Sequence, residues 1–149
     1  RIDILIKEII EEVSRTTHHK IHNKSQPNTY ITADKDRIAQ VINNLLTNAI
    51  KYSPRASEII VRTKKNTHYI TISVQDFGIA ISLENQQLIF DRFYQVNRPT
   101  GMTYPNQTFG LGLGLYIVKG ILDAHKGKIW VKSTKRDKGS TFSFTLPLE

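Results

Sequence analysis

The sequence predicts an α+β fold, a two-layer α/β sandwich whose helices pack on one face of a mostly antiparallel mixed sheet. Apolar residues recur with helical spacing in residues 3–14, in the segment that begins at Asp34, and again after a glycine-rich turn near residue 113. Other segments alternate apolar and polar residues with the period of a strand. The resulting order of helix, strands, helix and strands is typical of this architecture.

Length and composition limit the possible classes of protein. A chain of 149 residues can bury its own core, and we expect residues 1–149 to form a single domain. Hydrophobic residues make up 39% and charged residues 23%, which excludes a disordered chain or a coiled coil. The lack of cysteine excludes disulfides and thiolate metal sites. No apolar run is long enough to span a bilayer, so we expect no membrane contact by this domain.

The formal net charge of +8 fits either a nucleic-acid or anionic ligand, or a solvated lysine-rich surface. Lys and Arg are scattered rather than aligned along one helix face, which favours the solvated surface. We therefore predict no nucleic-acid partner, although a basic chain still attracts a polyphosphate.

The first helix is predicted over residues 3–14, because its apolar residues fall on one face, at Ile6, Ile9, Ile10 and Val13. Three histidines follow, at positions 18, 19 and 22. Their polar surroundings favour a loop or an edge strand over a metal site. Residues 30–32 are predicted to form a short strand.

The clearest helix begins at Asp34, a suitable N-cap, and ends before Pro54. Asn44 and Asn48 lie one turn apart beside its apolar stripe, and asparagine is a poor helix former. Their spacing indicates either a functional task or two polar residues that face solvent. The predicted buried stripe contains Ile38, Val41, Ile42, Leu45, Leu46, Ala49 and Ile50.

Residues 57–62 and 69–75 are predicted to form paired strands, and the second runs directly into Asp76 and Gly78. A carboxylate at a strand end, followed by glycine in a turn, is suited to accept a hydrogen bond from a ligand in a pocket. An exocyclic amine such as that of adenine is one such donor. The tripeptide at 76–78 also matches the metal-binding motif of protein kinases, but the companion kinase motifs are missing.

The remaining segments include a short helix at 83–88 and an aromatic segment at 90–94, which is either a core cluster or a docking edge. Residues 97–108 form a long polar loop, interpreted as a lid or as an ordinary surface loop. The glycine-rich turn is suited to bind phosphate at a helix N-terminus, or simply to pack. A helix then runs to about His125 and ends at Lys126 and Gly127, before strands at 128–134 and 141–146.

Taken in order, these motifs resemble the ATP-binding catalytic domain of sensor histidine kinases, in the GHKL superfamily that includes gyrase, Hsp90 and MutL. The resemblance covers almost the whole chain, and five motifs in order are more specific than any one of them. It implies a Bergerat fold, a protein-histidine kinase activity, and ATP and Mg²⁺ as cofactors. The alternative is a degenerate nucleotide-binding or protein-interaction domain without kinase activity.

The resemblance assigns the polar face of the second helix to the phosphates. It implies that Asn48 holds the Mg²⁺ and that Asn44 assists. Lys51 would meet phosphate, and Tyr52 would lie against the nucleotide. Relatives that hydrolyse ATP carry Glu where Asn44 stands, and an amide cannot act as that base. The resemblance therefore favours transfer to a protein histidine over hydrolysis.

The resemblance assigns a second group of residues to the adenine and to the lid. Asp76 would read the adenine amine, beside Gly78, Ala80 and Ile81, and Thr141 would lie near the base. The remaining pocket residues are those below the lid and in the glycine turn, namely Tyr94, Gly110, Leu111, Gly112, Leu113, Gly114 and Leu115. Two positions depart from the family pattern. Ala80 replaces a glycine, and Gln95 replaces an arginine, for which Arg92 and Arg98 are the candidate substitutes.

The resemblance also implies partners outside this chain. The phosphoacceptor histidine belongs to a separate dimerisation domain of the same protein, and none of the histidines at 18, 19 and 22 has the acidic residue expected after it. A cognate response regulator would accept the phosphoryl group next. We expect the isolated fragment to be a monomer and to be cytoplasmic, whether or not the parent protein is anchored in a membrane.

Overall fold

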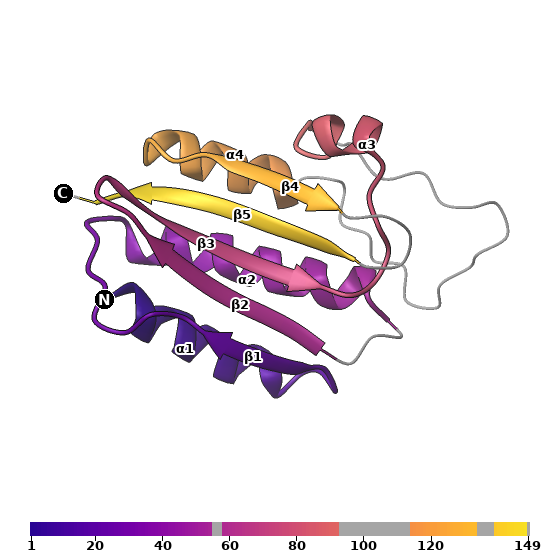
Figure 1. The fold of residues 1–149 in the computed structure, drawn as a ribbon, viewed down its shortest axis with the longest axis horizontal. Coiled ribbons are helices and arrows are strands. Elements are labelled where there is room, and N and C mark those ends of the chain that lie inside the picture. The colour runs from indigo at the N-terminus through magenta and orange to yellow at the C-terminus, as the bar shows by residue number, and fades with distance from the viewer. Residues whose placement is uncertain (55–57, 93–113, 134–138, 149) are drawn as a thin grey trace, which may run out of the picture.

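The computed structural model describes residues 1–54, 58–92, 114–133 and 139–148. Its strands form one five-stranded mixed sheet in the order β1-β2-β3-β5-β4, and its long helices lie together on one face (Figure 1). β1 (Lys20–Lys24) runs parallel to β2 (Glu58–Lys65), and the other neighbours are antiparallel. These are β3 (Tyr69–Asp76), β5 (Ser140–Pro147) and β4 (Ile129–Ser133). The predicted two-layer α+β fold is confirmed.

The helix layer contains α1 (Ile2–Ser14), α2 (Lys35–Tyr52) and α4 (Gly114–Ala124), while α3 (Leu83–Leu88) is a short helix near β4. α2 touches both α1 and α4, so it is the central helix. Its N-cap is Asp34, as predicted, because the Asp34 carboxylate accepts from the backbone N–H groups of Asp36 and Arg37 at 3.1 and 3.2 Å. None of the helices in the described ranges is long and apolar enough to cross a membrane.

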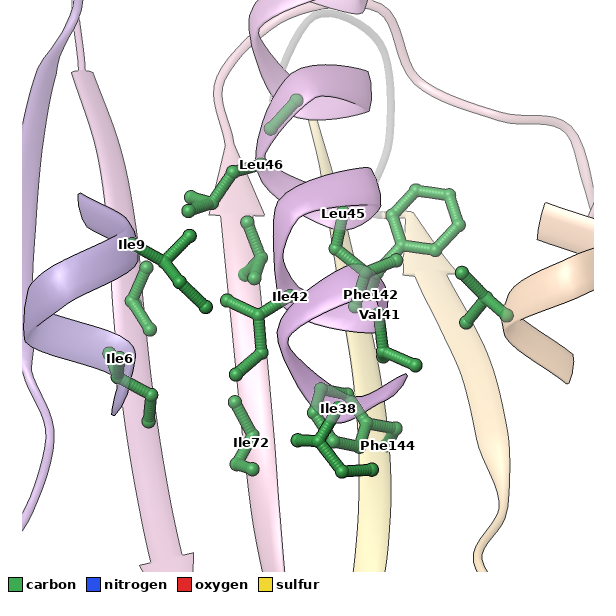
Figure 2. Packing of buried hydrophobic residues seen from close by; sticks show 14 of the residues in the cluster. Ile6, Ile9, Ile38, Val41, Ile42, Leu45, Leu46, Ile72, Phe142 and Phe144 are labelled. Carbon is green, nitrogen blue, oxygen red and sulfur yellow. The ribbon is translucent and has the colours of Figure 1, made fainter. Parts of the chain in front are cut away.

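The core lies between this helix layer and the sheet. Figure 2 shows side chains of α2 between Ile6 and Ile9 of α1 and the phenylalanines of β5. Phe144 is fully buried, and the inward residues of β3 alternate with half-buried polar ones, as a sheet with one covered face requires. All the residues of the predicted stripe of α2 are buried except Ile50, which is half-buried.

The segment after the first helix differs in part from the prediction. Within the histidine region, His22 lies in the edge strand β1 and His18 and His19 lie in the bend before it, so each predicted alternative holds for part of the region. Residues 30–32 do not form a strand, which corrects the prediction. They connect the sheet to the helix layer across the start of α1, where the backbone N–H of Ile2 donates to the carbonyl oxygen of Thr29 at 3.0 Å. Ile31 packs against the core and Tyr30 is largely exposed, but the segment is not part of the five-stranded sheet and so lacks the pairing that makes a strand.

The C-terminal end of α4 lies where the sequence predicts it, but its two residues act differently. The left-handed residue is Lys126, with a φ of 60°, and the following glycine is needed for space. A Cβ at Gly127 would overlap the backbone carbonyl oxygen of Thr145 in β5. Glycine is therefore required because helix and sheet backbones touch there.

Gly120, within α4, and Gly127, just after it, allow a matched test of this packing. We expect Gly127→Ala to destabilise the fold by about 1–3 kcal/mol, because β5 must shift. The same substitution at Gly120, an exposed helical position with open space around it, should stabilise the fold by up to about 1 kcal/mol. Urea denaturation followed by circular dichroism measures both free energies of unfolding. Equal effects of the two substitutions would contradict the close approach at Gly127.

Candidate functional site

The end of β3 and the end of α2 meet directly, although they are separated in sequence by the whole β2–β3 hairpin. The backbone N–H of Ile79 donates to the carbonyl oxygen of Tyr52 at 3.0 Å. A Cβ at Gly78 would overlap that same oxygen and the backbone of Ser53. Only glycine allows so close an approach. The turn that follows Asp76 therefore rests on the last turn of α2.

Asp76 is a buried carboxyl at this junction, with only 2% of its surface exposed. Burial raises its pKa to about 6, and the backbone N–H groups of Gly78 and Ser140 partly offset this rise. Both N–H groups donate to Oδ1, at 3.0 and 3.3 Å. The second oxygen, Oδ2, receives no hydrogen bond from the described part of the chain. A buried carboxyl with one oxygen held and the other available is suited to accept from a polar ligand.

The residue of β5 that contacts the Asp76 carboxyl is Ser140, a role that the sequence analysis did not assign. Thr141 pairs with Gln75, so its side chain lies on the opposite face of the sheet from the Asp76 side chain. Gly139, with a φ of 74°, brings its own backbone against the carbonyl oxygen of Asp76. Gly139 and Ser140 thus contact Asp76, while the placement of Thr141 near the adenine stays a prediction.

Two serines fix the loop that follows Asp76. The hydroxyl of Ser133 on β4 accepts from the N–H of Ile81 at 2.8 Å and donates to the carbonyl of Gly139 at 2.9 Å. The hydroxyl of Ser140 donates to the carbonyl of Ile79 at 3.3 Å. No sequence signal pointed to Ser133, because its partners come from two segments that are distant in sequence, at Ile81 and at residues 139–140.

Ala80 sits in this loop without backbone strain. Among the described residues other than glycine, only Asn28 and Lys126 have a positive φ. Ala80 therefore adopts an ordinary conformation, and the loss of the usual glycine imposes no strain there.

The polar side chains of α2 line its last three turns, close to the same junction. Asn44 and Asn48 are both half-buried and lie one turn apart, as predicted. The ammonium group of Lys51 lies 5.9 Å from the centre of the Tyr52 ring. The last turns of α2 thus carry neutral amide oxygens and a cation on the helix whose end meets the turn at residues 77–79. Among the described residues, no three His, Asp or Glu side chains come together as a metal site.

The described part of the chain does not place several other predicted pocket residues at this junction. Tyr94 and residues 110–113 lie outside the described residues, as does the loop at 97–108. Gly114 is the first residue of α4, and a Cβ there would meet no described neighbour. The side chains of Ile81 and Leu115 pack against the core. In the aromatic segment, Phe90 contacts the ring of Phe142 edge-on at 6.3 Å, which favours the core-cluster alternative for that residue.

Comparison with known proteins identifies relatives of the chain. Residues 33–149 match the family described as histidine kinase-, DNA gyrase B- and HSP90-like ATPase. The chain is 36% identical to the sensor histidine kinase WalK of Bacillus subtilis over 139 residues, which cover 91% of this chain and 22% of WalK. The chain spans less than half the length of the curated relatives that it matches.

Solved structures agree with this family in fold. ShkA, solved in full length with AMPPNP, superposes with a TM-score of 0.83 at 26% identity, covering 99% of this chain and 30% of ShkA. The catalytic domain of the histidine kinase ThkA superposes with a TM-score of 0.78 at 29% identity, covering 98% of this chain and 93% of that one. ThkA has also been solved in complex with the response regulator TrrA.

The burial of Asp76 makes a prediction about stability. Because the folded state raises its pKa from 3.8 to about 6, the folded protein binds more protons than the unfolded protein between these values. The contribution of Asp76 to stability is therefore greatest below pH 4 and falls as the pH rises to about 6, by about 3 kcal/mol in total. Asp76→Asn keeps an oxygen for both N–H donors and removes the charge.

We expect Asp76→Asn to be more stable than the wild type at pH 7 and to lose this part of the pH dependence. Urea denaturation of both proteins from pH 4 to pH 7 measures the difference. A variant that is less stable than the wild type at pH 7, with the same slope against pH, would contradict the buried-charge interpretation.

Proposed function

The chain belongs to the histidine kinase-, DNA gyrase B- and HSP90-like ATPase family, and from this we propose that it binds ATP for a sensor histidine kinase. It would transfer the γ-phosphoryl group to a histidine on a separate dimerisation domain of the same protein. The observation that carries the proposal is the buried Asp76 carboxyl, held by the turn that packs on the end of α2. Adenine and phosphate recognition would thereby share one rigid junction.

On the adenine side, Asp76 would accept a hydrogen bond from the exocyclic amine through Oδ2. The two N–H groups on Oδ1 orient the carboxyl, and Gly78 leaves room for the turn. Ser140 holds Asp76 and the loop at 79–81, so it would act indirectly on the base. A buried acceptor discriminates strongly, because a ligand without the amine leaves the carboxylate unpaired.

On the phosphate side, Asn48 with help from Asn44 would offer amide oxygens to a Mg²⁺ ion, and Lys51 would meet a phosphate. The donor set fits this ion, since Mg²⁺ prefers oxygen ligands and is usually held by few protein groups together with substrate phosphates. The ion would neutralise the charge of the phosphates. Because the described residues hold no carboxylate cluster, the nucleotide itself would complete the coordination.

Transfer is favoured over hydrolysis by the residue at position 44. Asn44 cannot take a proton from water, so this helix supplies position and charge but no general base. The acceptor histidine would come from the dimerisation domain, and a response regulator would receive the phosphoryl group next. The complex of ThkA with TrrA supports such a partner. We place this domain on the cytoplasmic side in the parent protein.

The adenine contact is tested by calorimetric titration with Mg-ATP. We expect Asp76→Asn to weaken binding by about tenfold to a hundredfold, since an amide NH₂ or a neutral acceptor replaces a charged hydrogen bond. Wild-type affinity should also fall as the pH drops below about 6, because protonation removes the charge of the acceptor. Unchanged affinity in the variant would refute the role of Asp76, and no binding at millimolar ATP would favour a degenerate domain.

The metal contact is tested by phosphoryl transfer. With the histidine-bearing domain added, the wild type should form acid-labile phosphohistidine from radiolabelled Mg-ATP, and Asn48→Ala should reduce its rate by about a hundredfold or more. Asn43→Ala is the matched control, because Asn43 is exposed on the same helix. Equal rates in the two variants would exclude Asn48 from the reaction.

A further inference from the structure

His19 joins the segment after α1 to the end of α2, across 34 positions of sequence. Its ring nitrogen Nε2 lies 2.8 Å from the carbonyl oxygen of Ser53, the residue that caps α2. We infer that His19 is a positioning residue for the nucleotide site, acting through the end of α2. This inference rests on the proposed function.

The hydrogen bonds around His19 fix which atom donates. The backbone N–H of His19 donates to the hydroxyl oxygen of Thr17 at 3.2 Å. That hydroxyl lies 2.8 Å from Nδ1 of the same ring, so its proton is available to Nδ1. Nε2 then carries the ring proton and donates it to the Ser53 carbonyl. Thr17 thereby orients the ring toward α2, although both residues are only half-buried.

Ser53 occupies the point where the helix stops. It is fully buried, its φ of −129° and ψ of 57° are not helical, and its own hydroxyl donates to the carbonyl of Ala49 at 2.5 Å. The last carbonyl groups of a helix lack partners within the helix. His19 satisfies one of them from outside, where a donor also complements the negative end of the helix dipole.

The residue before Ser53 carries the contact with the adenine side. Tyr52 accepts from Ile79 through its carbonyl, and Gly78 packs against both Tyr52 and Ser53. The two carbonyls of this dipeptide thus accept from different segments. The Tyr52 carbonyl accepts from the turn after β3, and the Ser53 carbonyl accepts from His19. Release of the Ser53 carbonyl would let the dipeptide turn, and would change the distance between Asp76 and the asparagines of α2.

The test compares three variants with the wild type. His19→Leu keeps an apolar volume and removes the donor, whereas His19→Gln can place an amide N–H near the position of Nε2. Thr17→Val keeps the imidazole and removes the hydroxyl that orients it. His18→Leu is the control, because His18 is the exposed neighbour in the same segment.

Two readouts are needed on proteins shown by circular dichroism to be folded. Calorimetry with Mg-ATP should give about a tenfold weaker affinity for His19→Leu, a smaller loss for Thr17→Val, and values within about twofold of the wild type for His19→Gln and His18→Leu. Amide hydrogen exchange by NMR, without nucleotide, should show faster exchange at the Ile79 N–H in His19→Leu, a smaller increase in Thr17→Val, and no change in His19→Gln or His18→Leu.

The outcomes separate the inference from the proposed function. If the wild type binds no ATP, the proposed function fails, while the exchange at Ile79 still tests the link from His19 to the turn. If the wild type binds and His19→Leu binds equally well, the inference is wrong. A merely structural role would lower the free energy of unfolding of His19→Leu and leave its affinity and its Ile79 exchange unchanged. Should His19→Leu fail to fold, Thr17→Val and His19→Gln carry the same comparison.

Discussion

The candidate site depends on the contact between two backbones at the end of α2. The Tyr52 carbonyl accepts from Ile79, and Gly78 leaves no gap between the turn and the helix. Hydrogen bonds between backbone groups have little freedom in direction, so this contact sets the helix and the strand end at one distance. This contact joins the helix that carries the asparagines to the strand end that carries Asp76.

Asp76 is costly in this fold, and the neighbouring strands limit that cost. A buried carboxylate loses hydration, which appears as its raised pKa, and two N–H groups return part of that energy. The surrounding core is tightly closed, since Ile59, the partner of Asp76 on β2, and Val74, two residues before it on β3, are almost fully buried. The apolar surface buried between the helix layer and the sheet offsets the desolvation cost of the Asp76 carboxyl. Such buried ionisable groups are common at functional sites.

Much of the fold could be predicted from the sequence, because local rules operate there without help. The helical spacing from Asp34 to Tyr52 and the alternation from Ile70 to Asp76 each require one buried face, and each was located to within a residue or two. The strand predicted at residues 30–32 failed, since short apolar segments match several structures until a neighbour selects one. Lys126 takes the left-handed position, and the glycine after it is needed because the backbone of β5 lies against it. That contact comes from tertiary packing, which the local sequence does not encode.

By itself, the sequence determined the chemical groups of the site: two amides one helical turn apart and a carboxylate at a strand end. It did so because helix period and strand alternation depend only on neighbouring residues. The tertiary structure alone decided which groups support them. The strand register puts Ser140, rather than Thr141, against Asp76. The folding of distant segments brings Ser133 and His19 to their partners. Such contacts join residues far apart in the chain, and no local pattern encodes them.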